Sequence, residues 1–230
     1  YSVSSDYTLI PTGVNNTDGC CTYYATSAST GLTNYTVTYS QPTGGSISVT
    51  YTNPSGQTGQ NVSSGGSVVP TCIITVTATA NSGYALNTLT VNGGAFTSGN
   101  TYVVRSNTTI SATFNSKPTG VTLSATSSIT NTQATLNGNI GTNGGLNITD
   151  YGFYYSTTNG FNDGEGTKTQ VGTNNTTGAF SKILSGLNAG TTYYIKAYAT
   201  NSIGTTYSTQ GSFETSAATC SAPFTLNDTS

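Results

Sequence analysis

The stretch LSGLNAGTTYYIKAYATNSIGTTYS, residues 184–208, carries the clearest strand pattern in the second half of the chain. Every second residue from Ile195 to Ala199 is apolar, so these side chains fall on one side of an extended segment. Asn201 and Gly204 follow, and both residue types favour a tight turn. The pattern predicts a half-buried β-strand that ends in a turn.

The same alternation runs through the whole chain of 230 residues. Gly or Asn-Gly interrupts it about every eight to twelve residues, a spacing typical of β-sandwiches and barrels. Two of these interruptions, Asn92-Gly93 and Asn143-Gly144, lie between candidate strands and predict hairpin turns. We therefore predict an all-β chain of two tandem β modules, without a helix.

We assign residues 116–216 to the second module, which resembles the fibronectin type III domains common in secreted Bacteroidetes proteins. Leu187, Gly190 and Tyr193 keep the spacing of that family's L-x-x-G-T-x-Y corner. The resemblance implies an Ig-like β-sandwich with a tyrosine corner, in which Tyr193 packs inside and its hydroxyl bonds a nearby backbone group. The chain has no Trp, so we expect Leu136 to fill the core layer that a Trp fills in animal domains.

The first module, residues 41–115, resembles the divergent internalin-B-type repeats of bacterial surface proteins. Its most specific part is ATANSGYALNTLTVNG, residues 78–93. The resemblance implies a small β-rich module without known catalytic residues. NSKPTG, residues 115–120, is the predicted linker between the modules. Two β-prone segments lie outside both modules, an N-terminal extension at 1–40 and a C-terminal tail at 217–230.

Charge is scarce along the chain. Only 5% of residues are charged, and five Lys plus Arg against seven Asp plus Glu give a net charge of −2. The chain therefore lacks the basic stripe of a nucleic-acid binder, and no apolar run is long enough to insert into a membrane. It also has no His, which removes the usual catalytic triads and most metal sites. We expect no enzyme activity, no catalytic residue and no cofactor.

The only acidic cluster in the sequence is Asp163 with Glu165, in the Gly-rich segment NGFNDGEGTK at 159–168. Two carboxylates this close together on a loop are poorly placed to act across a sugar ring. We expect a solvated turn balanced by Lys168. A Ca²⁺ site is the weaker alternative, because Asn162 would add a further oxygen ligand.

Four cysteines, Cys20, Cys21, Cys72 and Cys220, suggest disulfides formed in an oxidising compartment. A bond between the adjacent Cys20 and Cys21 would be strained, so we expect them to take separate partners. Cys72 is a near partner for one of them. Cys220 would meet the remaining cysteine in the next copy of the chain, or else fold back within its own chain.

The opening segment YSVSSDYTLI, residues 1–10, reads as a β-strand with Tyr1, Val3, Tyr7 and Leu9 on one side. Neither module requires it. We expect these four residues to pack into the sheet of an adjacent subunit, because a strand at a free terminus satisfies an unpaired sheet edge. An extra edge strand on its own first domain is the alternative.

These features together predict a structural subunit of an extracellular bacterial filament, pilus-like or matrix-forming, at the cell surface. Copies would join head to tail by strand exchange and inter-subunit disulfides. A stalk or adhesin fragment of a larger surface protein is one alternative. A spacer or glycan-binding module of a secreted enzyme is another, in which tyrosines would stack on sugars. The expected partner is the chain itself, with surface glycans or other cells as further partners.

Overall fold

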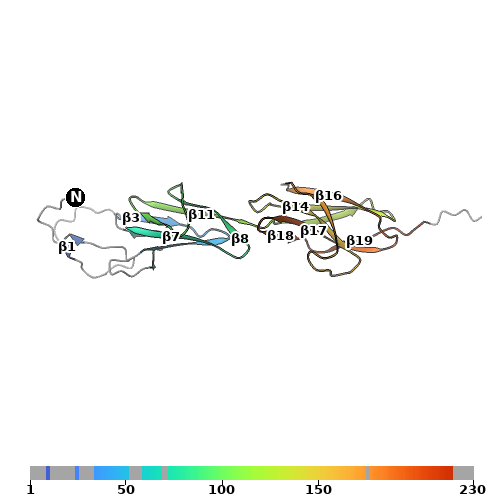
Figure 1. The fold of residues 1–230 in the computed structure, drawn as a ribbon, viewed down its shortest axis with the longest axis horizontal. Helices are drawn as coiled ribbons and strands as arrows, with labels where there is room; N and C mark the ends of the chain where they lie inside the picture. Colours follow the sequence, from blue (N-terminus) through green and yellow to red (C-terminus); the bar gives the residue numbers. More distant parts are fainter. Residues whose placement is uncertain are drawn as a thin grey trace, which may run out of the picture. The chain divides into compact units, whose positions relative to one another are not determined.

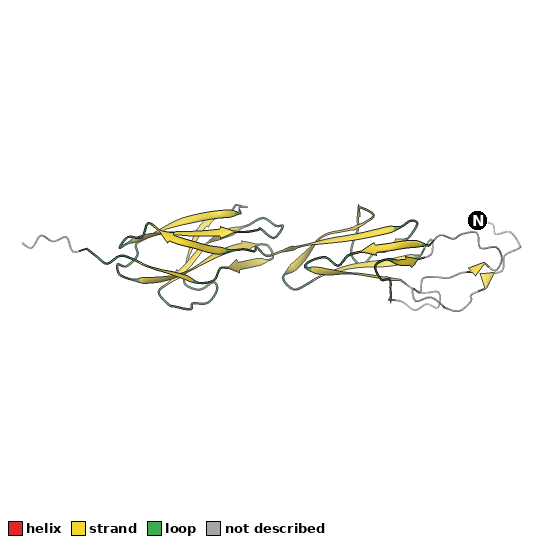
Figure 2. Ribbon diagram, turned by 180° about the vertical axis from the view of Figure 1, so that it is seen from behind, coloured by secondary structure: helices red, strands yellow, loops and turns green. Residues whose placement is uncertain are grey.

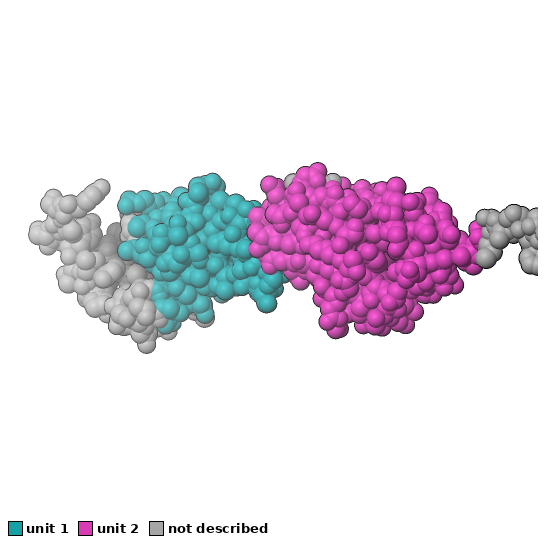
Figure 3. Space-filling view, turned by 45° about the vertical axis from the view of Figure 1, so that its right-hand side comes forward, with its two compact units in different colours: residues 1–115 teal, residues 116–230 magenta. Residues whose placement is uncertain are grey.

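The computed structural model describes residues 9–10, 24–25, 34–51, 59–68, 72–174 and 177–219. All regular secondary structure in these ranges is β-strand (Figures 1 and 2), which confirms the all-β prediction. The same ranges hold no helix that is long and apolar enough to cross a bilayer. The chain divides into two compact units, residues 1–115 and 116–230 (Figure 3).

The first unit contains two sheets that share one apolar core. The first sheet runs β10-β7-β4-β5, made of Thr101–Val103, Ile73–Ala80, Gly45–Tyr51 and Gln60–Asn61. The second runs β6-β3-β11-β8-β9, made of Gly66–Val68, Tyr35–Tyr39, Thr108–Ser116, Tyr84–Val91 and Gly94–Ala95. Within β7, Ile74, Val76 and Ala78 are buried, so alternate side chains point into the core.

The strand β3 belongs to the sheet of the first unit. It pairs in parallel with β11 and antiparallel with β6, and Val37 at its centre is fully buried. The predicted boundary between residues 40 and 41 therefore leaves out a strand that the unit contains. Alternation in the sequence indicated a strand here, but it carries no information about a partner at the opposite end of the unit.

The two predicted hairpins differ in outcome. Asn92 and Gly93 have φ angles of 51° and 78°, and Val91 pairs with Gly94, so a two-residue turn joins β8 to β9 as predicted. Asn143-Gly144 makes no such hairpin, because the strands before and after it, β13 and β14, lie in different sheets.

The second unit is a β-sandwich. Its smaller sheet runs β12-β13-β16, made of Thr122–Ser127, Gln133–Ile140 and Gly178–Ser185. Its larger sheet runs β15-β14-β17-β18, made of Thr167–Gly172, Asp150–Ser156, Thr192–Asn201 and Gly204–Tyr207, and β19 (Gly211–Glu214) also pairs with β17. Leu136 and Phe153 are fully buried in the core, as expected for Leu136.

A separate two-stranded sheet is formed by β1 (Leu9–Ile10) and β2 (Tyr24–Ala25). Leu9 pairs with Ala25, and Ile10 pairs with Tyr24, in the same chain.

Candidate functional site

The outer face of the β15-β14-β17-β18 sheet gathers charged and aromatic side chains in a chain that has few charges. Ile195, Ala197 and Ala199 of β17 are buried in the core, so Lys196 and Tyr198 between them face outward. Strand pairing places Tyr154 of β14 between Lys168 and Lys196, and Tyr198 beside Tyr207 of β18. The outward residues of β17, Lys196 and Tyr198, thus belong to the candidate site.

Asp150, the first residue of β14, ties three strands together. Its Oδ2 lies 2.6 Å from Nζ of Lys168, and its Oδ1 accepts hydrogen bonds from the Tyr198 hydroxyl and Gln170 Nε2, both at 2.9 Å. Partial burial acts to raise the pKa of Asp150, but the hydrogen bonds from Lys168, Tyr198 and Gln170 outweigh it and lower the pKa. The carboxylate is therefore ionised at neutral pH and holds β14, β15 and β17 together.

Tyr198 is only 1% exposed although it faces outward. Its ring centroid lies 5.1 Å from that of Tyr154 and 6.4 Å from that of Tyr207, and the Lys168 ammonium lies 5.1 Å from it. Burial, together with the hydrogen bond to the Asp150 carboxylate, raises the pKa of Tyr198 far above its ordinary value. The phenol therefore stays protonated and acts as a donor.

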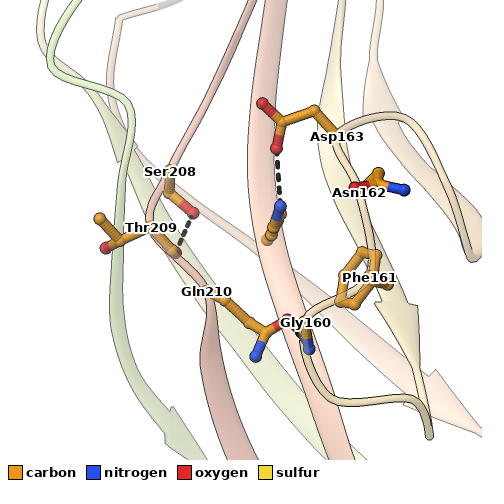
Figure 4. A pocket seen from close by; sticks show the side chains of 8 residues that line it. Gly160, Phe161, Asn162, Asp163, Ser208, Thr209 and Gln210 are labelled. Carbon is orange, nitrogen blue, oxygen red and sulfur yellow. Dashed lines mark hydrogen bonds and ion pairs between the residues drawn. The ribbon is translucent and has the colours of Figure 1, made fainter.

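A cavity of about 510 Å³ opens on the outer face of the same sheet (Figure 4). Its walls come from β17, from the β14–β15 connection and from the β18–β19 connection. Nζ of Lys196 lies 2.7 Å from Oδ1 of Asp163 and 5.2 Å from the centre of the Phe161 ring. The lining residues are Gly160, Phe161, Asn162, Asp163, Lys196, Ser208, Thr209 and Gln210.

Side-chain hydrogen bonds hold the walls of this cavity in place. Gln210 Oε1 accepts from the backbone N–H of Gly160 at 3.0 Å, and Gln210 Nε2 donates to Asn159 Oδ1 at 2.8 Å. Glu165 Oε2 accepts from both the backbone N–H and Nδ2 of Asn162, each at 3.1 Å. The Gln210 bonds join the two connections that face each other across the cavity, and the Glu165 bonds hold the β14–β15 connection to itself.

The two carboxylates of the predicted acidic cluster have different partners. Asp163 pairs with Lys196, whereas Glu165 accepts from Asn162. Lys168, which we expected to balance this turn, pairs with Asp150 instead, so that prediction was wrong. The described part of the chain holds no group of three or more His, Cys, Asp or Glu side chains that could bind a metal ion.

The corner residues of the second unit lie together at the start of β17. Tyr193 is buried, and its hydroxyl accepts a hydrogen bond of 3.0 Å from the backbone N–H of Asn188. Leu187 is buried too, and its N–H donates to the Thr132 carbonyl at 3.0 Å. Gly190 has a φ of 58°, a left-handed conformation that glycine adopts without strain. The hydroxyl of Tyr193 thereby fixes the segment that enters β17.

Most of the predicted assembly residues lie outside the described ranges: Tyr1, Val3, Tyr7, Cys20, Cys21 and Cys220. Leu9 is described, and it pairs within its own chain. Cys72 is 3% exposed in the core of the first unit, and its carbonyl accepts from the Val104 N–H at 2.9 Å. Strand exchange between subunits and disulfide connectivity stay predictions.

Comparisons with known proteins give structural likeness at low identity. No protein-family model and no curated protein matches the chain. The sensor domain of the anti-sigma factor RsgI4 of Pseudobacteroides cellulosolvens is 18% identical, with a TM-score of 0.34 over 44% of this chain and 98% of that one.

Two multidomain structures are also similar. Domains of titin are 16% identical, with a TM-score of 0.32 over 63% of this chain and 58% of theirs. The FN1–FN3 domains of chicken CNTN1 are 17% identical, with a TM-score of 0.31 over 75% of this chain and 56% of theirs. The chain thus spans little more than half the length of these two. Likeness at this level transfers no function, so the all-β assignment stands on the strand pairings themselves.

Proposed function

We propose that this chain is a non-catalytic, load-bearing structural segment of an extracellular bacterial fibre or stalk. The observation that carries the proposal is the parallel pairing of β3 with β11, which lie at the N-terminal and C-terminal ends of the first unit's sheets.

Parallel pairing of end strands favours resistance to stretching. Val37, Thr38 and Tyr39 lie beside Thr108, Thr109 and Ile110 in the same direction. A pull on the two chain ends draws β3 backward and β11 forward, so the strands are sheared along their length. The hydrogen bonds of such a ladder must break together, whereas a ladder that opens from one end breaks them one at a time.

Additional bonds fasten β3 at both of its ends. The Thr36 N–H donates to Asn107 Oδ1 at 3.0 Å, and Asn107 directly precedes β11. The Tyr39 hydroxyl donates to the Val62 carbonyl at 2.8 Å, and the Tyr39 N–H donates to Ser64 Oγ at 2.9 Å. β3 is therefore held near its start and at its end by side-chain bonds, in addition to its ladder with β11.

The composition of the chain supports a place in a fibre or stalk. A surface of Ser, Thr, Asn and Gly with a net charge of −2 offers little electrostatic resistance to close packing of copies. In the filament version, copies of the chain join head to tail through the N-terminal strand and the cysteines. In the stalk version, one chain bears load as part of a longer surface protein.

Single-molecule stretching tests the load-bearing role. The intact chain is pulled from its two ends, and Asn107→Ala is compared with Asn87→Ala. Asn87 is the matched control, because its Nδ2 bonds Thr113 Oγ1 at 3.1 Å between β8 and β11, away from β3. We expect Asn107→Ala to lower the unfolding force of the first unit and Asn87→Ala to leave it unchanged. Equal forces for both variants and the unmodified chain would remove the basis of the proposal.

Electron microscopy separates the two versions. If copies exchange strands, deletion of residues 1–10 abolishes filaments formed by the purified chain. If the chain is part of a stalk, it stays monomeric with or without these residues.

A further inference from the structure

We propose that the cavity beside Asp163 and Lys196 is a binding subsite for a neutral saccharide. Asp163, labelled in Figure 4, stands on the β14–β15 connection. Its side chain meets that of Lys196 of β17 at the cavity, with a separation of 2.7 Å between charged atoms. The inference concerns the second unit only and is independent of the load-bearing role of the first.

The charge at this cavity is balanced. The Asp163 carboxylate and the Lys196 ammonium both line it. An anionic ligand would be repelled by Asp163, and a cationic ligand would be repelled by Lys196. A neutral ligand meets neither penalty. The Asp163 side chain is 58% exposed and can be reached from solvent, whereas that of Lys196 is 14% exposed and packs over Phe161.

The polar atoms at the cavity suit hydroxyl groups, which both donate and accept. Lys196 gives one N–H to Asp163 and keeps two further donors. Asp163 uses Oδ1 for that bond, and no other described residue bonds its second carboxylate oxygen. Neighbouring hydroxyls of a sugar ring can donate to the carboxylate and accept from the ammonium at the same time, and both bonds are charge-assisted.

The cavity is preformed, which lowers the entropic cost of binding. Gln210 bonds both Gly160 and Asn159 across the cavity, and Glu165 holds Asn162 in a closed turn. A cavity of about 510 Å³ also lies within the usual range for small-ligand sites, roughly 300–1,000 Å³.

Partly buried aromatic rings lie next to the polar wall. Tyr207 directly precedes Ser208, which lines the cavity. The Tyr207 hydroxyl lies close to Gly164, next to Asp163 in sequence, because a Cβ added to Gly164 would be 3.2 Å from it. The Tyr207 ring centroid is 6.0 Å from that of Tyr154. Sugar rings present C–H faces as well as hydroxyls, and aromatic faces with a polar edge suit such amphipathic surfaces.

Binding to the intact chain tests the proposal. Neutral oligosaccharides of glucose, xylose, mannose and N-acetylglucosamine are titrated by calorimetry and by NMR, alongside an oligouronate and a deacetylated, cationic amino-sugar oligomer. We expect a neutral oligosaccharide to bind and to shift the backbone amide signals of residues 160–163 and 208–210. We expect weaker binding of both charged oligomers.

Two carboxylate-to-amide variants, one at the cavity and one away from it, form a test and its control. Asp163→Asn should weaken binding of the neutral oligosaccharide about tenfold, the loss expected for one charge-assisted hydrogen bond. Glu214→Gln makes the same charge change at an exposed position of β19 that does not line the cavity, so it should leave affinity unchanged. Both variants should keep the melting temperature of the second unit.

Three results would overturn the proposal. They are failure of every neutral oligosaccharide to bind, equal weakening by Asp163→Asn and Glu214→Gln, and tighter binding of the oligouronate that strengthens further in Asp163→Asn. The last result would assign the cavity to anions through Lys196.

Discussion

The two units hold their end strands in different ways. In the first unit, β3 and β11 pair directly and in parallel, and Val37 of β3 is fully buried. In the second unit, β12 pairs antiparallel with β13 in one sheet, and β19 pairs with β17 in the other. Leu123 of β12 packs close to Gly211 of β19. A Cβ added to Gly211 would lie 2.9 Å from a methyl group of Leu123. The end strands of the second unit are therefore joined by side-chain packing, not by a ladder.

The second unit has side-chain bonds across its larger sheet. Asp150 connects β14, β15 and β17 through Lys168, Gln170 and Tyr198. These bonds stabilise the fold at equilibrium, but none of them involves β12 or β19. The first unit thus has a direct ladder between its end strands, whereas the side-chain network of the second unit lies away from its end strands.

The largest expected effect comes from the core of the second unit. Leu136→Ala removes a fully buried side chain and should lower the free energy of unfolding of this unit by about 2–5 kcal/mol. Urea denaturation followed by residue-resolved NMR should show this loss in residues after 116 and no change in β3–β11 pairing. An equal loss in both units would mean that they do not unfold separately.

Asp150→Asn should have the next largest effect, a loss of about 1–3 kcal/mol in the second unit. The pKa of Asp150 is lowered from its ordinary value of 3.8, so the carboxylate contributes stability above that pH and loses it as pH falls through the lower folded value. The stability difference between the unmodified chain and the variant should therefore be constant near neutrality and shrink below pH 3.8.

Thermal melts over a pH series measure this difference. A gap that stays constant down to the lowest pH would show that the ionised carboxylate is not the source of the stability.

Tyr193→Phe should cost less, about 1 kcal/mol, because it removes only the hydroxyl that accepts from the Asn188 N–H. The buried ring remains, so the sandwich still folds. Hydrogen exchange should accelerate at Asn188 and its neighbours, whereas Tyr155→Phe should leave exchange at Asn188 unchanged. Unchanged exchange in Tyr193→Phe would mean that the hydroxyl does not fix this segment.

Local sequence patterns were sufficient to predict parts of both units. The apolar positions of β17 in the second unit and the two-residue turn at Asn92-Gly93 in the first unit follow from patterns within a few residues. The burial of Leu136 was instead expected from the resemblance to fibronectin type III domains and the lack of Trp. The ion pairs could not be predicted from such local patterns. Lys168 lies near Asp163 in sequence, yet the pairing of β15 with β14 brings it to Asp150.

Long-range features explain the rest. The parallel partner of β3 lies at the other end of the unit, and a strand's own alternation gives no information about which strand pairs with it. The cavity depends on two connections that meet only after β14, β17 and β18 have assembled. The outward positions of β17 carried the missing signal, because Lys196 and Tyr198 alternate with its core residues.

The most direct test is the order in which the two units unfold when the intact chain is stretched from its ends. Asn107→Ala marks the event of the first unit, because it removes the bond between Asn107 Oδ1 and the Thr36 N–H of β3 and should lower the force of that event alone. The parallel ladder between β3 and β11 predicts that, in the unmodified chain, the marked event occurs second, at the higher force, after the second unit has unfolded. If the first unit unfolds at the lower force, its end-strand ladder does not bear load, and the account of this protein as a load-bearing segment is wrong.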